Sequence, residues 1–111
     1  MGRSHQPMPD RLPEKLRYIR RHLDLTQEQM VARLKARLRE SHEADVPLYP
    51  GHISGYERGI REPPLVVLLQ YARLAAVPLE NLVDDSLDLP GYYFRYRIED
   101  AVRERKRHNP E

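Results

Sequence analysis

The sequence contains no cysteine among its 111 residues. The chain therefore has no disulfide and no thiolate metal site, and we expect it in a reducing compartment, the cytoplasm. No run of about 18 apolar residues occurs, so a membrane-spanning helix is not expected. The N-terminal MGRSHQPMPD has no apolar stretch behind its basic residue and does not resemble a secretory signal peptide.

Net charge is also small, at +2 from 19 basic and 17 acidic side chains. The charges are unevenly distributed: residues 1–22 hold six Arg or Lys against two acids, and residues 75–91 hold four acids and no base. Separated charge of this size also occurs on an ordinary solvated surface. Charge alone therefore does not establish binding to nucleic acid.

Patterns of catalytic or metal-binding residues are missing as well. The five histidines are scattered, and no Ser-His-Asp order, paired-carboxylate pattern or glycine-rich phosphate loop occurs. The segment His42-Glu43-Ala44-Asp45 brings an imidazole and two carboxylates together without the fixed spacing of a metal site. We therefore expect no enzyme activity, no cofactor and no metal.

Apolar side chains recur at helical spacing in five segments, which predicts one all-α domain over residues 10–85. Residues 1–9, with two prolines and a glycine, are predicted to form a flexible arm. The first helix is expected after Asp10, which can cap its start, with Pro13 in the first turn, where a missing N–H costs nothing. Its apolar stripe comprises Leu12, Leu16, Ile19 and Leu23.

The second and third helices carry clear start and stop signals. Thr26 and Gln29 match a capping box, in which each side chain bonds the other residue's amide. The apolar positions Met30, Leu34 and Leu38 then continue the helix to about residue 40. An exposed loop is expected over residues 41–47. A short third helix should follow, opened by Pro50-Gly51, with Ile53 and Tyr56 inward, and ended by Gly59.

Two further helices complete the expected domain. The fourth follows Pro63-Pro64 and is expected to bury nearly all of its apolar side chains: Leu65, Leu68, Leu69, Ala72 and Leu74. Pro78 is expected to begin a one-turn fifth helix that carries Leu79, Leu82 and Val83.

Residues 86–111 form a C-terminal extension with a different pattern. Tyr92, Phe94, Tyr96 and Ile98 alternate with Tyr93, Arg95 and Arg97, which predicts a strand. A single exposed strand is not stable alone. Three interpretations follow: it pairs with its two-fold mate and forms a dimer, it packs on the helical core of its own chain, or the segment is an amphipathic helix.

Four short segments, in their order and spacing, resemble the Cro and phage-repressor type of helix-turn-helix protein, the XRE family of bacterial regulators. They are Leu16-x-x-Ile19-Arg20, Leu25-Thr26-Gln27-Glu28, Ile53-Ser54-Gly55-Tyr56-Glu57-Arg58-Gly59 and Pro64-Leu65-x-x-Leu68-Leu69-x-x-Ala72-x-x-Ala75. The resemblance covers about residues 12–84. It implies a five-helix domain that binds double-stranded DNA as a homodimer and regulates transcription, most simply as a repressor.

The resemblance also implies roles for single residues. The position of Gln27 contacts the DNA backbone and braces the third helix, and Arg20 pairs with Glu57 to tie the first helix to the third. The plainer interpretation of Gln27 is a solvated residue in a first turn. Phosphate contacts are expected from the exposed amides of the helix start at Thr26, and from four arginines: Arg17, Arg21, Arg58 and Arg61. The plainer interpretation of the last two is an interaction with the dipole of the third helix.

The sequence departs from the family in the connection between the second and third helices. The segment between Leu34 and Leu48 is about a dozen residues longer than the family pattern, with the insert at residues 36–47. Because the tight turn is gone, core packing must hold the two helices at their angle. The side chains expected to do so are Met30, Leu34, Leu48, Ile53 and Tyr56.

The second departure concerns recognition of bases. The positions that contact bases in the family correspond here to Tyr49, Pro50, Gly51, His52 and Gly55. None is Arg, Lys, Asn or Gln, the common base-contacting types, and only Tyr49 and His52 can donate or accept a hydrogen bond. Either specificity is low, or the inserted loop recognises DNA, or the helix binds another partner. The alternative function is therefore a protein-interaction module, including an antitoxin-like partner binder, on a helix-turn-helix scaffold.

Overall fold

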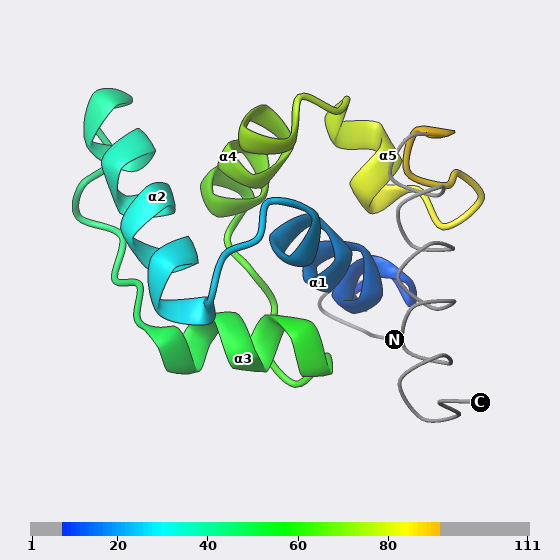
Figure 1. The fold of residues 1–111 in the computed structure, drawn as a ribbon, viewed down its shortest axis with the longest axis horizontal. Helices are drawn as coiled ribbons and strands as arrows, with labels where there is room; N and C mark the ends of the chain where they lie inside the picture. Colours follow the sequence, from blue (N-terminus) through cyan, green and yellow to red (C-terminus); the bar gives the residue numbers. More distant parts are fainter. Residues whose placement is uncertain (1–7, 92–111) are drawn as a thin grey trace, which may run out of the picture.

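The computed structural model describes residues 8–91, which form five helices and no strand (Figure 1). The helices are α1 (Leu12–His22), α2 (Gln27–Glu40), α3 (Pro50–Arg58), α4 (Leu65–Ala75) and α5 (Leu79–Val83). The all-α prediction is confirmed for this part of the chain. The five helices lie close to their predicted positions, although α1 ends at His22, one residue before Leu23 of its expected stripe. The predicted strand at 92–98 lies outside the described residues, as do residues 1–7 of the expected arm.

The five helices surround one apolar core. α1 lies between α3 and α4, α2 contacts both α3 and α4, and the short α5 packs on α1 and α4 (Figure 1). The side of α3 that faces away from α1 and α2 is not covered by any other helix of the described range. The five side chains expected to hold α2 against α3 are all buried, which confirms that part of the prediction: Met30, Leu34, Leu48, Ile53 and Tyr56.

The predicted ends of α2 and α3 are confirmed. Thr26 Oγ1 accepts a hydrogen bond from the Gln29 amide at 3.1 Å, and Gln29 Oε1 accepts one from the Thr26 amide at 2.8 Å. Both halves of the capping box therefore form, and α2 continues to Glu40. Gly59 ends α3 in a left-handed conformation with φ of +75°, which an L side chain adopts only with strain.

The start of α1 differs from the prediction. Asp10 does not cap the helix; Arg11 is the N-cap residue and makes no side-chain cap bond. Instead, the Asp85 carboxylate accepts hydrogen bonds from the amides of Asp10 at 2.9 Å and Arg11 at 3.0 Å. A carboxylate from the far end of the described chain therefore anchors the two residues that lead into α1, while none of its bonds goes to an amide of the first helical turn.

Lys15 makes a second connection between the same two parts of the chain. Its side chain is only 3% exposed, and its ammonium donates to the carbonyl oxygens of Asn81 at 2.7 Å, Asp84 at 3.1 Å and Leu87 at 2.8 Å. Asn81 lies within α5, Asp84 is its C-cap residue and Leu87 follows it. Lys15 is not one of the apolar stripe positions of α1. Its aliphatic stem is nevertheless buried, while its ammonium is hydrogen-bonded to backbone carbonyl oxygens.

Arg11 extends this arrangement beyond residue 85. Its guanidinium donates to the Asp85 carbonyl oxygen at 3.0 Å and forms an ion pair with Asp88. We call the four residues Arg11, Lys15, Asp85 and Asp88 the terminal clasp. The helical body therefore includes the first residues of the extension expected at 86–111. At the other end of the described range, Met8 of the expected arm packs against the core.

The prediction that Leu65 is buried is wrong, since its side chain is 68% exposed. The buried face of α4 contains Val67, Leu68, Tyr71, Ala72 and Ala75. At about 100° per residue, Leu65 lies roughly 200° from Val67 and so points away from the core. Leu69 and Leu74, also expected inside, are half-buried.

The inserted loop between α2 and α3 is partly anchored. Gln70 of α4 is buried, and its amide nitrogen donates to Ser41 Oγ at 3.2 Å while its amide oxygen accepts from Arg37 Nε at 3.2 Å. Val46 packs against the core. Glu43 is half-buried, and four side chains of the loop are exposed as predicted: His42, Ala44, Asp45 and Pro47. Across the described range, no helix combines the length and apolar character that a bilayer span requires.

Candidate nucleic-acid interface

The expected ion pair between Arg20 and Glu57 is present. Arg20 Nε lies 2.6 Å from Glu57 Oε2, and Arg20 Nη2 lies 2.9 Å from Oε1, which is a two-point contact. The two side chains are 15% and 5% exposed, so water screens the pair weakly. The hydrogen bond to Glu57 raises the pKa of the Arg20 guanidinium above its ordinary value, and Arg20 remains charged.

The same carboxylate also contacts the first residue of α2. Gln27 Nε2 donates to Glu57 Oε1 at 3.3 Å, and Arg20 Nη1 donates to the Leu25 carbonyl oxygen in the α1–α2 turn at 2.9 Å. Gln27 is half-buried, so the interpretation of a merely solvated residue does not hold. The start of α2 is thus tied to α1 and to the end of α3 through one carboxylate.

The first turn of α3 is only partly available to a ligand. Tyr49 is its N-cap residue, with a side chain 60% exposed, and Pro50 and Gly51 are exposed beside it. His52 is half-buried. Its Nδ1 accepts a hydrogen bond from the Tyr49 amide at 3.0 Å, which leaves only Nε2 of the imidazole for another partner.

Gly55 does not belong to an exposed base-contacting surface, which corrects the expectation for this position. It is buried, and its carbonyl oxygen accepts hydrogen bonds from the amides of Ile60 at 3.0 Å and Arg61 at 3.3 Å. A Cβ added to Gly55 would lie 3.0 Å from Arg61 Cβ. A larger residue here would crowd Arg61, whose side chain would have to shift to make room, because the chain turns back closely over the last turn of α3.

Two of the expected phosphate-binding arginines lie at the far end of α3. Arg58 is exposed and is the last residue of the helix. Its Nε donates to Ser54 Oγ at 3.1 Å, which directs the side chain along the helix surface. Arg61, three residues later, is also exposed.

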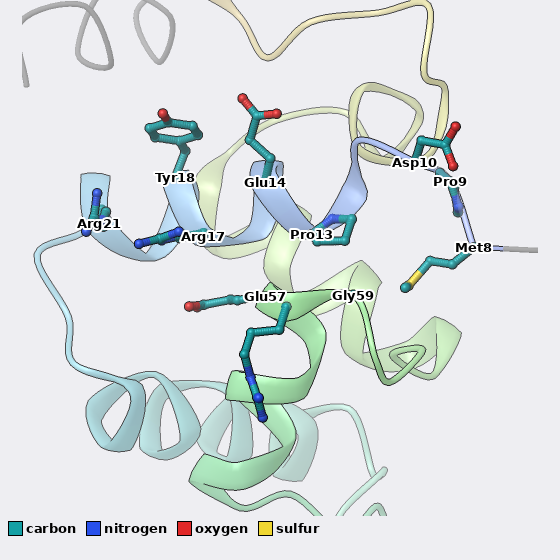
Figure 2. Close-up of a pocket in the computed structure, with 11 residues that line it drawn as sticks. Met8, Pro9, Asp10, Pro13, Glu14, Arg17, Tyr18, Arg21, Glu57 and Gly59 are labelled. Atoms are coloured by element: carbon teal, nitrogen blue, oxygen red, sulfur yellow. The ribbon is translucent and has the colours of Figure 1, made fainter. Parts of the chain in front are cut away.

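The other two arginines, on α1, border an open cavity of about 750 Å³ between α1 and the end of α3. Arg17 is exposed and Arg21 is half-buried. In Figure 2, Glu14 and Tyr18 extend from the side of α1 opposite to Glu57 and Gly59. The lining contains both signs of charge: Asp10, Glu14, Arg17, Arg21, Glu57 and Arg58.

Lys35 is a further candidate for the nucleic-acid interface that no sequence pattern indicated. Its ammonium lies over the Tyr49 ring, 5.4 Å from the ring centroid. The two residues are 14 positions apart, and the inserted loop separates them. A cation–π contact of this kind leaves no local signal, so only the packing of α2 against α3 reveals it.

No protein-family model, curated protein or solved structure matches this chain.

Proposed function

We propose that this protein is a DNA-binding transcriptional regulator with a phage-repressor-like helix-turn-helix domain, acting as a dimeric repressor. The three-residue network of Arg20, Gln27 and Glu57 carries the proposal. It sets the start of α2 against the end of α3 while the outer side of α3 stays uncovered. A helix-turn-helix protein docks on a duplex with such a pair: one helix for the groove and one helix start for the adjacent backbone.

In this proposal α3 enters the major groove and the first turn of α2 faces a phosphate. Thr26 and Gln27 supply the helix start, where amide groups and the helix dipole favour an anion. Arg58 and Arg61 supply positive charge at the other end of α3. Arg17 and Arg21 add charge on the neighbouring face of α1. Most affinity would be sequence-independent and would fall steeply with salt.

The C-terminal extension at 86–111 supplies the dimer contact in this proposal. Two copies related by a two-fold axis would place their α3 helices in successive major grooves, about 34 Å apart on a pseudo-palindromic operator. Repression follows if the bound dimer blocks the polymerase.

The test is a fluorescence-anisotropy titration of a random-sequence duplex of about 30 base pairs, long enough for two half-sites, at several salt concentrations. The Arg58→Ala/Arg61→Ala variant should bind all sequences more weakly, with the slope of log K against log salt reduced by about 2 per chain. Sedimentation of the wild-type complex should give two chains per duplex.

The matched control is the Arg39→Ala/Arg73→Ala variant. It removes the same charge from two exposed arginines that lie in the last turns of α2 and α4 rather than at the end of α3. The control should keep the wild-type salt slope. Equal losses in the two variants, or no duplex binding by the wild type at low salt, would refute the proposal.

One observation favours the protein-interaction alternative. Three large side chains are exposed: Tyr49, the N-cap residue of α3, at 60%; Ile60, between α3 and α4, at 70%; and Leu65, the first residue of α4, at 68%. Exposed aromatic and aliphatic groups of this size often contact a protein partner. This function would be supported instead if the wild type bound no duplex DNA but bound a protein partner, and if the Ile60→Lys variant no longer bound that partner.

A further inference from the structure

The exposed start of α3 is apolar. We call Tyr49, Pro50 and Gly51 the α3 tip; all three residues are exposed, and the Tyr49 hydroxyl is their only side-chain hydrogen-bonding group. In the major groove, apolar side chains recognise one group above all, the C5 methyl of thymine. The tip therefore suits a thymine methyl better than the hydrogen-bonding edge of a guanine or adenine.

The Tyr49 ring is held in place before any ligand arrives. Its amide donates to His52 Nδ1, its ring centroid lies 5.4 Å from that of His52, and the Lys35 ammonium lies over the ring. A ring that is 60% exposed yet contacted by two neighbours loses little freedom on binding. Such preorganisation lets a small apolar contact contribute to affinity.

The charges around the tip match a polyanion. The only carboxylate of α3 is Glu57, which is 5% exposed and paired with Arg20. Lys35 lies beside the tip, and Arg58 lies at the opposite end of the helix. The exposed surface of α3 therefore has a cation near each end, an apolar start and no exposed carboxylate, which fits a duplex with phosphates on both sides of a groove.

We propose that Tyr49 makes the specific base contact of this protein by packing its ring against the C5 methyl of a thymine, while Lys35 neutralises an adjacent phosphate. This inference rests on the proposed function and deepens it, because it names the recognised group and makes an A·T pair the preferred one at that position.

The test begins with selection from a random duplex library, carried out in parallel with the wild type and with Tyr49→Ala. Each thymine of the duplex that the wild type enriches most is then replaced singly by deoxyuridine, which removes only the methyl. One replacement in each half-site should weaken wild-type binding about fourfold, the effect of withdrawing one methyl from apolar contact. The other replacements should change binding little.

Three variants test the contribution of the Tyr49 ring separately from that of the Lys35 charge. Tyr49→Ala should bind thymine and deoxyuridine duplexes equally and should lose the A·T preference at that position alone. Tyr49→Phe keeps the ring and should keep the discrimination. Lys35→Ala should flatten the salt dependence and leave the thymine-to-deoxyuridine ratio unchanged. Because Tyr49 and Lys35 are exposed, all three should fold, as circular dichroism can verify.

The outcomes distinguish the two proposals. If the wild type binds no duplex, the proposed function itself fails. If it binds and selects a sequence, but every deoxyuridine replacement is neutral or Tyr49→Ala selects the same sequence, the regulator proposal stands and the Tyr49 contact is wrong. The contact is supported only when the methyl effect appears with the ring and disappears without it.

Discussion

Three side chains from three helices meet at a single shielded carboxylate. Arg20 of α1 and Gln27 of α2 both donate to Glu57 of α3. Because the arginine and the carboxylate are largely removed from water, each depends on the other for compensation of its charge. Removing one partner strands the other, which costs far more than loss of an exposed pair.

A double-mutant cycle should measure this dependence. Arg20→Met and Glu57→Gln should each lower the free energy of unfolding by about 3 kcal/mol. The double variant should lose less than the sum of the two, with a coupling energy of about 2 kcal/mol. Urea denaturation followed by circular dichroism provides the measurement.

The control cycle uses Arg17→Met and Glu28→Gln, which change exposed residues of α1 and α2. Each change should stay within about 0.5 kcal/mol, with no coupling. A coupling energy near zero for Arg20 and Glu57 would mean that the pair does not hold the helices together.

At the scale of the helix, the two exposed glycines of the α3 region differ in whether their position could accept a residue with a Cβ. Gly51 lies in the first turn of α3, with no atom within 4 Å of a Cβ built there. Gly59 follows the last turn with φ of +75°, and its Cβ would lie 3.3 Å from Pro13 Cγ of α1. Sequence position alone makes both look like helix-end glycines, but only one needs to be glycine.

Alanine substitutions should therefore change stability in opposite directions. Gly59→Ala should lower the free energy of unfolding by about 1–2 kcal/mol, because the left-handed conformation strains an L residue. Gly51→Ala should raise it by about 0.5 kcal/mol, because alanine restricts the unfolded chain and fits the helix. Thermal unfolding of the two variants beside the wild type gives both values. Shifts of the same sign would contradict the assigned backbone conformations.

At the scale of the whole molecule, the terminal clasp joins the start of α1 to the segment after α5. The Asp85 carboxylate accepts from two amides at the start of α1, and Lys15 donates to three carbonyls around the end of α5. The clasp thereby fixes both ends of the described chain on one side of the body.

The clasp should make stability depend on pH. Hydrogen bonds from the amides of Arg11 and Asp10 lower the pKa of Asp85 below its ordinary value. The stabilisation is therefore fully present above the ordinary carboxyl range, about pH 4, and is lost as pH falls through the folded value. Asp85→Ala should lower the urea midpoint at pH 7, and the difference from wild type should shrink below about pH 4.

Asp45→Ala is the matched control, since Asp45 is an exposed carboxylate of the inserted loop. Its urea midpoint should follow that of the wild type at both pH values. A deficit of Asp85→Ala that persists unchanged in acid would show that the ionised carboxylate does not hold the clasp.

Local patterns predicted the helices of residues 8–91 well, because each signal acts within a few residues. The capping box of Thr26 and Gln29 spans one turn, and the left-handed Gly59 ends its own helix. The Arg20–Glu57 pair was expected only through the resemblance of the chain to a family, since 37 positions separate the two residues.

Tertiary contacts decided the remaining features. The Asp85 carboxylate bonds the Asp10 amide just before α1 from 75 positions away, and Lys15 donates to carbonyl oxygens up to 72 positions away. Leu65 points outward and Gly55 inward because neighbouring segments cover one side of each helix and leave the other open. Spacing along the chain determines which faces of a helix differ in polarity. Which face is covered, and by which distant group, depends on how the helices pack.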